Sequence, residues 1–216
     1  MKRLLKEFWF ALSCMRLLPH LALYKFGSVD SHLHADVLRW GSVVFGQNHK
    51  YGGAAIFCRI MTFYPEFRNI FYYRLGMLGR LFVPLCRPVA TLYIVTPKIG
   101  PGLFIQHGFA TIISAHEIGA NCWINQQVTI GFSNDTDRPT LGDGVTVHAG
   151  AKVIGEVYVG NFSTIGANAV VVRDVPANST VVGVPARIVR RDGVRVDEPL
   201  GPIHRSIQMD EVGAAK

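Results

Sequence analysis

The chain repeats a six-residue pattern in IGPGLFIQHGFA (residues 99–110), IGANCWINQQVTIGFS (118–133) and LGDGVTVHAGAKVIGEVYVGNFSTIGANAVVVRDV (141–175). An aliphatic side chain recurs every six positions, at Ile99 and Ile105, at Ile118, Ile124 and Ile130, and at Leu141, Val147, Val153, Val159, Ile165 and Val171. This period fits neither an α-helix, with about 3.6 residues per turn, nor a plain alternating strand, with about two. It is typical of hexapeptide β-helix coils, which stack to bury a continuous aliphatic ladder.

The segment Pro97–Arg191 resembles the left-handed β-helix acyltransferases. Within them it is similar to the serine acetyltransferase-like group, which includes exopolysaccharide O-acetyltransferases. The resemblance is carried by KIGPGLFIQHGFATII (98–113), INQQVTIG (124–131), GAKVIG (150–155) and GVPARIV (183–189). It implies a mainly β fold, a left-handed parallel β-helix with an N-terminal helical extension.

Three parts are expected along the chain. Residues 1–95 form a helical region, with loops at Gln47–Gly53 and around Pro65; residues 96–191 form the β-helix; residues 192–216 form a flexible tail. Within the β-helix, the polar stretch Gly131–Thr140 breaks the six-residue register. We expect it to be a loop that projects from a coil, the kind of segment that often carries function.

Composition narrows the class of protein. The 216 residues are 49% hydrophobic and 17% charged, and the net charge is +7. Since no basic run interleaved with aromatic residues is present, nucleic acid is not an expected partner. Anionic lipid headgroups or an anionic cofactor fit the positive charge better. The four cysteines are widely spaced without a CxxC pair, which favours free thiols, and Cys122 falls in a small-residue position of the repeat, which favours core packing.

His107, in the sequence IQHG, is the predicted catalytic residue. Transfer of an acyl group to an alcohol needs a general base, because a free hydroxyl is a weak nucleophile. The residue type alone favours a surface histidine on a solenoid turn. The resemblance assigns the base to this position and implies direct attack of the acceptor oxygen on the thioester of acetyl-CoA.

The resemblance also implies a homotrimer in which acetyl-CoA, the acyl donor, lies in the groove between subunits. By motif match, the cofactor-binding residues are Gly131, Ala149, Thr164, Ala167 and Arg187. Arg190 and Arg191 are further candidates for the phosphates, and a basic terminal coil that faces solvent is the alternative for all three arginines. No metal ligand is assigned.

Three departures from serine acetyltransferases bear on the acceptor. Gln106 replaces an acid before the histidine, Pro139 follows Arg138 where the family has another histidine, and the segment Leu92–Pro97 offers no carboxylate to orient His107. These losses argue against an amino-acid acceptor. The main expectation is therefore acetylation of a hydroxyl on a polysaccharide or glycan precursor, and serine or another small acceptor is the alternative. Asn125, Gln126 and Glu117 are weak candidates for orienting His107.

A third possibility is a non-enzymatic solenoid, or a β-helical metal enzyme. The latter would use His107, His116 and His148, but these histidines do not match that family's motif. The HxH pair His32 and His34 is more simply a loop or the start of a helix. Asp36 could occupy the place of an acidic substrate ligand, but the surrounding segment is too different for that role to be transferred.

The N-terminus favours attachment to a membrane surface. Residues 1–26 combine a cationic stripe with a wide apolar face that includes Phe8, Leu12, Met15 and Leu18. This pattern suits a helix lying in a membrane interface, while packing in an oligomer is the alternative. Arg16 and Pro19 interrupt the run, which disfavours a spanning helix, and no small-x-small cleavage site follows it. The expected location is cytoplasmic, peripheral on the inner face of the cell membrane.

Overall fold

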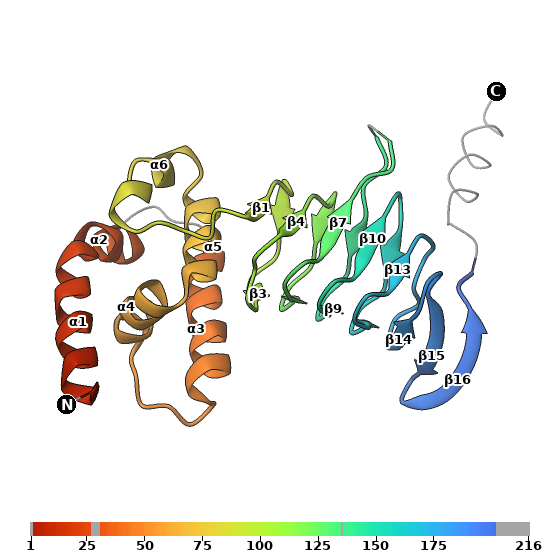
Figure 1. Ribbon diagram of the computed structural model, residues 1–216, viewed down its shortest axis with the longest axis horizontal. Coiled ribbons are helices and arrows are strands. Elements are labelled where there is room, and N and C mark those ends of the chain that lie inside the picture. Colours follow the sequence, from red (N-terminus) through yellow and green to blue (C-terminus); the bar gives the residue numbers. More distant parts are fainter. Residues whose placement is uncertain (1, 27–30, 135, 202–216) are drawn as a thin grey trace.

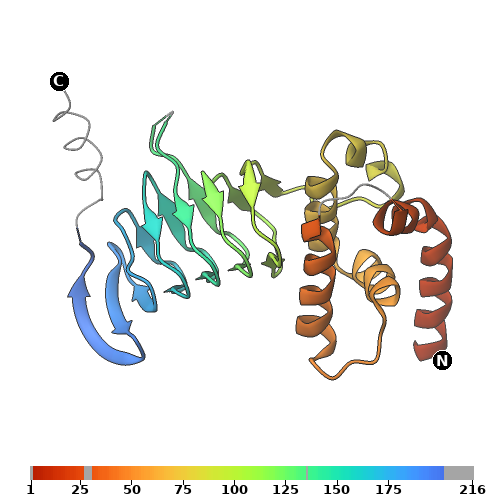
Figure 2. The same ribbon diagram turned by 180° about the vertical axis from the view of Figure 1, so that it is seen from behind.

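The computed structural model describes residues 2–26, 31–134 and 136–201. The molecule is elongated, with a cluster of helices at the N-terminal end and a solenoid of short strands extending away from it (Figure 1, Figure 2). The predicted fold class is confirmed: parallel strands coil after an N-terminal helical part.

The helical region, residues 1–91, carries all the α-helices of the described chain. These are α1 (Lys2–Arg16), α2 (Leu18–Phe26), α3 (Ser31–Phe45), α4 (Gly53–Phe63), α5 (Pro65–Leu75) and α6 (Met77–Arg80), followed by the 3₁₀ turn η1 (Val83–Leu85). As predicted, the first apolar run is helical and interrupted near Arg16, the HxH segment starts a helix, and loops separate α3 from α4 and α4 from α5. None of the described helices has the length and apolar character needed to span a bilayer.

Each coil of the solenoid supplies one strand to each of three parallel sheets. Sheet A contains β1 (Leu92–Ile94), β4 (Thr111–Ile113), β7 (Thr129–Gly131), β10 (Lys152–Ile154) and β13 (Val170–Val171). Sheet B contains β2 (Lys98–Ile99), β5 (Glu117–Ile118), β8 (Thr140–Leu141) and β11 (Tyr158–Val159). Sheet C contains β3 (Phe104–Ile105), β6 (Trp123–Ile124), β9 (Thr146–Val147), β12 (Thr164–Ile165) and β14 (Ser179–Val182), and then β15 (Arg187–Arg191) and β16 (Val194–Pro199).

The six-residue repeat is the core of the solenoid. Equivalent aliphatic residues pair in register between coils, as Ile105 does with Ile124 and Ile124 with Val147. These side chains are almost fully buried, and so is Cys122 in its small-residue position. That burial raises the pKa of the Cys122 thiol to about 12. Because successive coils stack identical shapes, the ladder is continuous along the solenoid.

The helical region is fastened to the first coil by polar contacts. Asp36 on α3 pairs with Arg74 on α5 at 2.8 Å and accepts hydrogen bonds from the backbone N–H groups of Gly102 and Leu103. Burial raises the pKa of the Asp36 carboxyl, while Arg74 and the two amides oppose that rise. Nearby, Trp40 Nε1 donates to the Leu103 carbonyl oxygen at 2.9 Å. Asp36 is thus a buried structural residue, and a role in binding substrate is not available to it.

Two expectations from sequence are corrected. The segment 92–94 is a strand of the first coil rather than the end of a helical stretch. The expected flexible tail from residue 192 onward is ordered in its first part: Val194–Pro199 forms strand β16, which pairs antiparallel with β15. Its polar composition resembles a tail, but main-chain hydrogen bonds to β15 order it. Residues 202–216 lie outside the described part of the chain.

Candidate active site

His107 lies at the corner between sheets C and A, where the first complete coil leaves β3. Its side chain is exposed, so a substrate could reach the imidazole. Its backbone is left-handed, with φ of 59°, and the Phe109 N–H donates to the His107 carbonyl oxygen in a tight turn. Other turns of the solenoid use the same conformation, for example at Gln127 and Asn168, so it reflects the geometry of the coil corner.

The corner at His107 is larger than its equivalents in later coils. Ile105 pairs with Ile124 and Ile113 pairs with Ile130, yet the first interval is eight residues and the second is six. Two additional residues therefore protrude here. They exceed the one-residue phase slip between Ile105 and Ile118, because the next interval, from Ile113 to Ile118, is one residue shorter than six. That slip is the sequence signal of this feature.

The main-chain hydrogen bonds place Gln126, Ala149 and Ala167 in one column with Phe109, two residues after His107. The N–H of Gln127 donates to the Phe109 carbonyl oxygen, that of Gly150 to the Gln126 carbonyl oxygen, and that of Asn168 to the Ala149 carbonyl oxygen. Neighbouring strands lie about 4.8 Å apart. The column therefore runs along the solenoid from Phe109, which shares the protruding corner with His107, to two alanines, whose small side chains leave room beside the backbone.

The other residues predicted to bind the acyl donor do not all lie in this column. Thr164 lies three residues before Ala167, on β12. Gly131 ends β7, at the opposite end of the sheet A strands from the His107 corner. Arg187 lies on the terminal hairpin, where it pairs with Asp197 at 2.9 Å. Arg191 pairs with Glu198 at 2.7 Å, and Arg190 is exposed.

Two of the side chains predicted to orient His107, those of Glu117 and Asn125, interact with other residues. Glu117 belongs to sheet B, where it pairs with Lys98 at 2.7 Å, so it lies on another face of the solenoid. Asn125 Oδ1 accepts a hydrogen bond from Trp123 Nε1 at 2.8 Å. Gln126 lies in the column with Phe109, two residues after His107.

A glutamate side chain that sequence reasoning missed approaches this corner from the helical region. A Cβ atom on Gly108 would lie 3.3 Å from Glu66 Cγ and 2.8 Å from Leu92 Cδ2. Glu66 is half-buried in the first turn of α5. Its helix is held in place by Asn69, which bonds to the Leu92 and Val89 carbonyl oxygens, and by Tyr73, which donates to the Thr96 carbonyl oxygen. No spacing in the sequence could have indicated this approach across 42 positions of chain.

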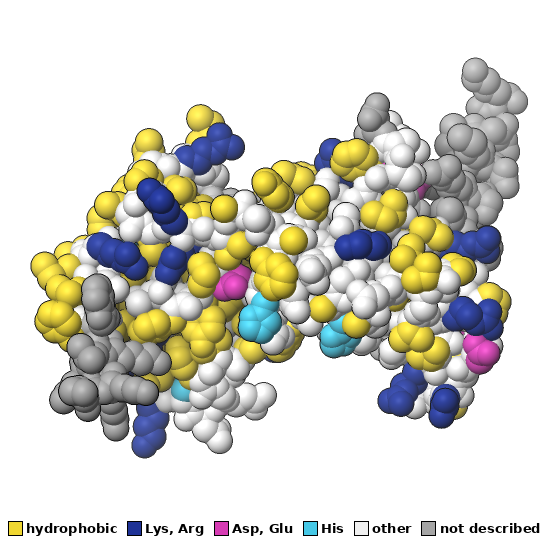
Figure 3. All heavy atoms as spheres, in the orientation of Figure 1, with side chains coloured by type: hydrophobic (Ala, Val, Ile, Leu, Met, Phe, Trp, Pro, Cys, Tyr) yellow, Lys and Arg dark blue, Asp and Glu magenta, His cyan; other side chains and the backbone are white. Residues whose placement is uncertain are grey.

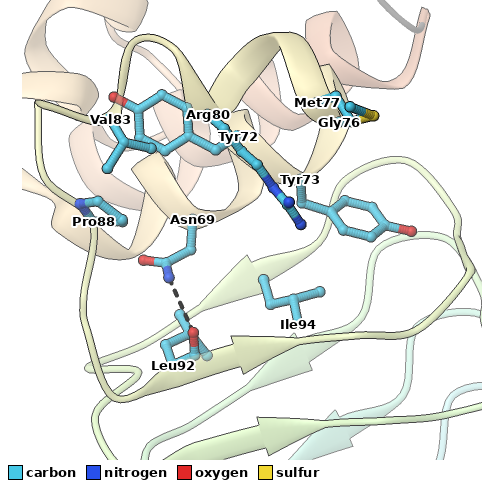
Figure 4. Close-up of a pocket in the computed structure, with 10 residues that line it drawn as sticks. All are labelled: Asn69, Tyr72, Tyr73, Gly76, Met77, Arg80, Val83, Pro88, Leu92 and Ile94. Atoms are coloured by element: carbon cyan, nitrogen blue, oxygen red, sulfur yellow. Dashed lines mark hydrogen bonds between the residues drawn. The ribbon is translucent and has the colours of Figure 1, made fainter. Parts of the chain in front are cut away.

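A cavity of about 420 Å³ opens beside this contact (Figure 4). It lies between α5, α6 and the first strand of sheet A. Figure 4 shows Asn69 pointing from α5 onto Leu92, with Ile94 below Tyr73. Its lining is mostly apolar and aromatic apart from Asn69 and Arg80, and His107 is not among the residues that form it.

The loop after β7 projects from the solenoid, as predicted (Figure 1). Asp137 accepts hydrogen bonds from the backbone N–H groups of Ser133 and Asn134, and the Ser133 hydroxyl also donates to it. The Ser133 hydrogen bond lowers the pKa of Asp137. Arg138 lies over the Phe132 ring, with its guanidinium carbon 5.6 Å from the ring centroid. Since this loop leaves the far end of sheet A, Arg138 and His107 occupy different corners of one chain.

No group of three potential metal ligands is found among the described His, Cys, Asp and Glu residues. His34 of the HxH pair instead interacts with Tyr24, whose hydroxyl lies 2.9 Å from His34 Nδ1.

Comparison with known proteins identifies the family. A model of the bacterial transferase hexapeptide (six repeats) matches residues 138–173. A serine acetyltransferase of Synechococcus elongatus is 41% identical over 152 residues, which is 64% of this chain and 62% of the relative. One from Helicobacter pylori is 37% identical over 147 residues, which is 62% of this chain and 86% of the relative. The chain belongs to the serine acetyltransferase family of hexapeptide-repeat proteins.

Solved serine acetyltransferase structures are similar in fold. The soybean enzyme complexed with serine matches with a TM-score of 0.60 and 27% identity, over 80% of this chain and 75% of that one. A serine acetyltransferase complex with CoA matches with a TM-score of 0.54 and 25% identity, over 78% and 72%. The match covers less than two thirds of the Synechococcus relative and about half, 52%, of a Staphylococcus aureus one.

The expectation of a polysaccharide or glycan acceptor is wrong, because the relatives at 37–44% identity are named serine acetyltransferase. Gln106 and Pro139 report only on the positions next to His107 and Arg138 in the chain. Segments distant in the sequence also approach this corner, as Glu66 does at Gly108.

Proposed function

We propose that the protein is an acetyl-CoA-dependent O-acetyltransferase that acetylates the hydroxyl of L-serine. The observation that carries this proposal is its similarity to serine acetyltransferases over about 150 residues, together with the exposed histidine on the protruding corner. Acetyl-CoA is the donor and serine the acceptor.

In this mechanism, His107 is the general base. It removes the proton from the serine hydroxyl as that oxygen attacks the thioester carbonyl carbon, and the thiolate of CoA leaves and takes up a proton. A rigid coil suits this role because the two substrates must be held in line.

For the donor we propose the column formed by Ala149 and Ala167, with the backbone of Gly131, the side chain of Thr164 and the guanidinium of Arg187 contributing around it. Because Gly131 and the loop with Arg138 lie at a different corner from His107, a second copy is needed to bring both ends to one groove. A homotrimer satisfies this requirement. Exposed apolar side chains on sheet A, including Tyr93 and Ile112, support an interface there.

For the acceptor we propose that the Glu66 carboxylate binds the ammonium group of serine. The Glu66 side chain lies against Gly108, next to His107, and its charge is opposite in sign to that of the ammonium group. The described residues give Glu66 no ion-pair partner of its own. A half-buried carboxylate without a cation is well placed to bind one from the substrate.

The direct test measures thiol release from acetyl-CoA by the purified chain, with and without L-serine. Serine-dependent release of CoA supports the proposal, and acetyl-CoA turnover that does not respond to serine overturns it.

The role of Glu66 has its own test. Replacing Glu66 with Gln should raise the KM for serine about tenfold or more, since a hydrogen bond to a charged group contributes roughly 1.5–3 kcal/mol. It should leave the KM for 3-hydroxypropionate, which lacks the ammonium group, nearly unchanged. Equal losses with both acceptors would mean that Glu66 acts on the histidine or the fold instead.

We also propose a cytoplasmic protein held peripherally at the inner face of the cell membrane. The support comes from α1, where Phe8, Leu12 and Met15 are exposed although large and apolar. The opposite side of the helix packs on α4, where Phe10 stacks on Phe63.

A further inference from the structure

The net positive charge of the chain comes from its helical end. Residues 1–91 contain 12 Lys and Arg and 4 Asp and Glu, a net charge of +8. Residues 92–216 contain 10 and 11, a net charge of −1. Such an asymmetry indicates a partner of negative charge for the helical end.

The same end exposes large apolar side chains beyond those of α1. The segment 77–87, which reads MLGRLFVPLCR, faces two ways. Gly79 and Cys86 are buried, and Phe82 packs against His20 of α2, with ring centroids 5.8 Å apart. The outward positions carry exposed side chains: Met77, Leu78, Leu81 and Leu85.

Cations surround this outward face. Arg80 and Arg87 are exposed within the segment itself, and Lys25 is exposed on α2, which packs against it. Figure 3 shows hydrophobic and cationic side chains interleaved over the helical end of the molecule. Met77 is 83% exposed and Leu81 is 73% exposed, so burying these two side chains against a partner would remove much apolar surface from water.

We propose that segment 77–87, together with α2, is a docking surface for a bilayer that contains anionic lipids. Met77, Leu81 and their neighbours enter the headgroup region, and Arg80, Arg87 and Lys25 meet lipid phosphates. Apolar side chains flanked by cations are the composition that binds such surfaces. A second copy of the chain is a poorer occupant, because two surfaces of this kind would bring like charges together.

The inference rests on the proposed peripheral location and does not depend on acetyl transfer to serine. Thiol release in vesicle-free solution tests the latter separately, so either can fail alone.

The experiment is flotation of the full chain with vesicles of equal parts phosphatidylglycerol and phosphatidylcholine, compared with phosphatidylcholine alone. Binding should require phosphatidylglycerol and weaken as salt rises. The double variant Met77→Ser, Leu81→Ser should bind at least about tenfold more weakly, since two exposed apolar groups no longer insert. Arg80→Gln and Arg87→Gln should each lose about fivefold.

The matched control is Val194→Ser, which removes a side chain of similar exposure, 65%, from the far end of the solenoid. It should bind as the unchanged protein does, and all variants should keep the same thermal unfolding midpoint. Binding that is equal on both vesicles, or unaffected by the double variant, overturns the proposal. So does a loss of self-association in the double variant without any vesicle binding by the unchanged protein.

Discussion

The solenoid and the helical region are held together by different kinds of contact. Each coil of the solenoid buries the same few aliphatic positions against the next, so its stability is spread along a repeated ladder. The helical region has a single aromatic core, with Trp40, Phe57, Phe67 and Phe71 fully buried, and it joins the first coil through specific polar groups. Damage to the solenoid is therefore shared among coils, whereas the junction depends on individual residues.

Two ion pairs, one at the junction and one on the solenoid, illustrate this difference, because their N–O distances are nearly equal but their exposure is not. Asp36 and Arg74 are 2.8 Å apart with side chains 0% and 2% exposed. Lys98 and Glu117 are 2.7 Å apart with side chains 73% and 38% exposed. Distance alone would rank them together, but water solvates the second pair when it is broken and not the first.

The largest effect should come from the corner where the two regions meet. His107→Ala should lower kcat for acetyl transfer by about 10²–10⁴-fold, because the attacking hydroxyl loses its base. The matched control is His116→Ala, an exposed histidine on the same solenoid that should retain activity. Full activity of the His107 variant would show that the base lies elsewhere.

The buried pair at the junction should give the next largest effect. Asp36→Asn should lower the free energy of unfolding by about 3–5 kcal/mol, because Arg74 then keeps a buried charge without its partner. Urea unfolding followed by tryptophan fluorescence will measure it, since Trp40 lies at this junction. A change of well under 1 kcal/mol would mean that the polar junction is not what holds the two regions together.

The helical region should also respond to pH. Burial lowers the pKa of His20, and the nearby charges of Arg16 and Arg68 lower it further, against a hydrogen bond with the Phe82 backbone. The unfolded chain takes up this proton near pH 6.5, about the ordinary value for histidine, and the folded chain only at lower pH. Stability should therefore be full above about pH 6.5 and decline as the pH falls through that value. The decline should be shallower in His20→Leu; an identical pH slope in that variant would assign it to other groups.

The smallest effect should come from the exposed pair on the solenoid. Glu117→Gln should change the free energy of unfolding by less than about 1 kcal/mol, because Lys98 remains solvated. Comparing this change with that for Asp36→Asn under the same conditions isolates the contribution of burial to the strength of an ion pair. A loss comparable to that of Asp36→Asn would remove the contrast between the two regions.

The sequence could predict the solenoid and its candidate base because both depend on local periodicity. The six-residue spacing identifies the buried ladder, the interval between Ile105 and Ile118 marks the larger corner, and IQHG places His107 on it. The acceptor was predicted wrongly, since Gln106 and Pro139 report only on their own positions. The strand Val194–Pro199 was missed because its order comes from pairing with β15.

The amino-acid sequence by itself determined the coil, its core and the position of the histidine, since a repeating shape needs only neighbours six residues apart. The tertiary structure alone decided that Asp36 is a buried junction residue, that Glu66 lies against Gly108, and that segment 77–87 exposes its apolar side. These contacts join positions tens of residues apart through the packing of α3, α5 and α6, and no local pattern encodes such distances.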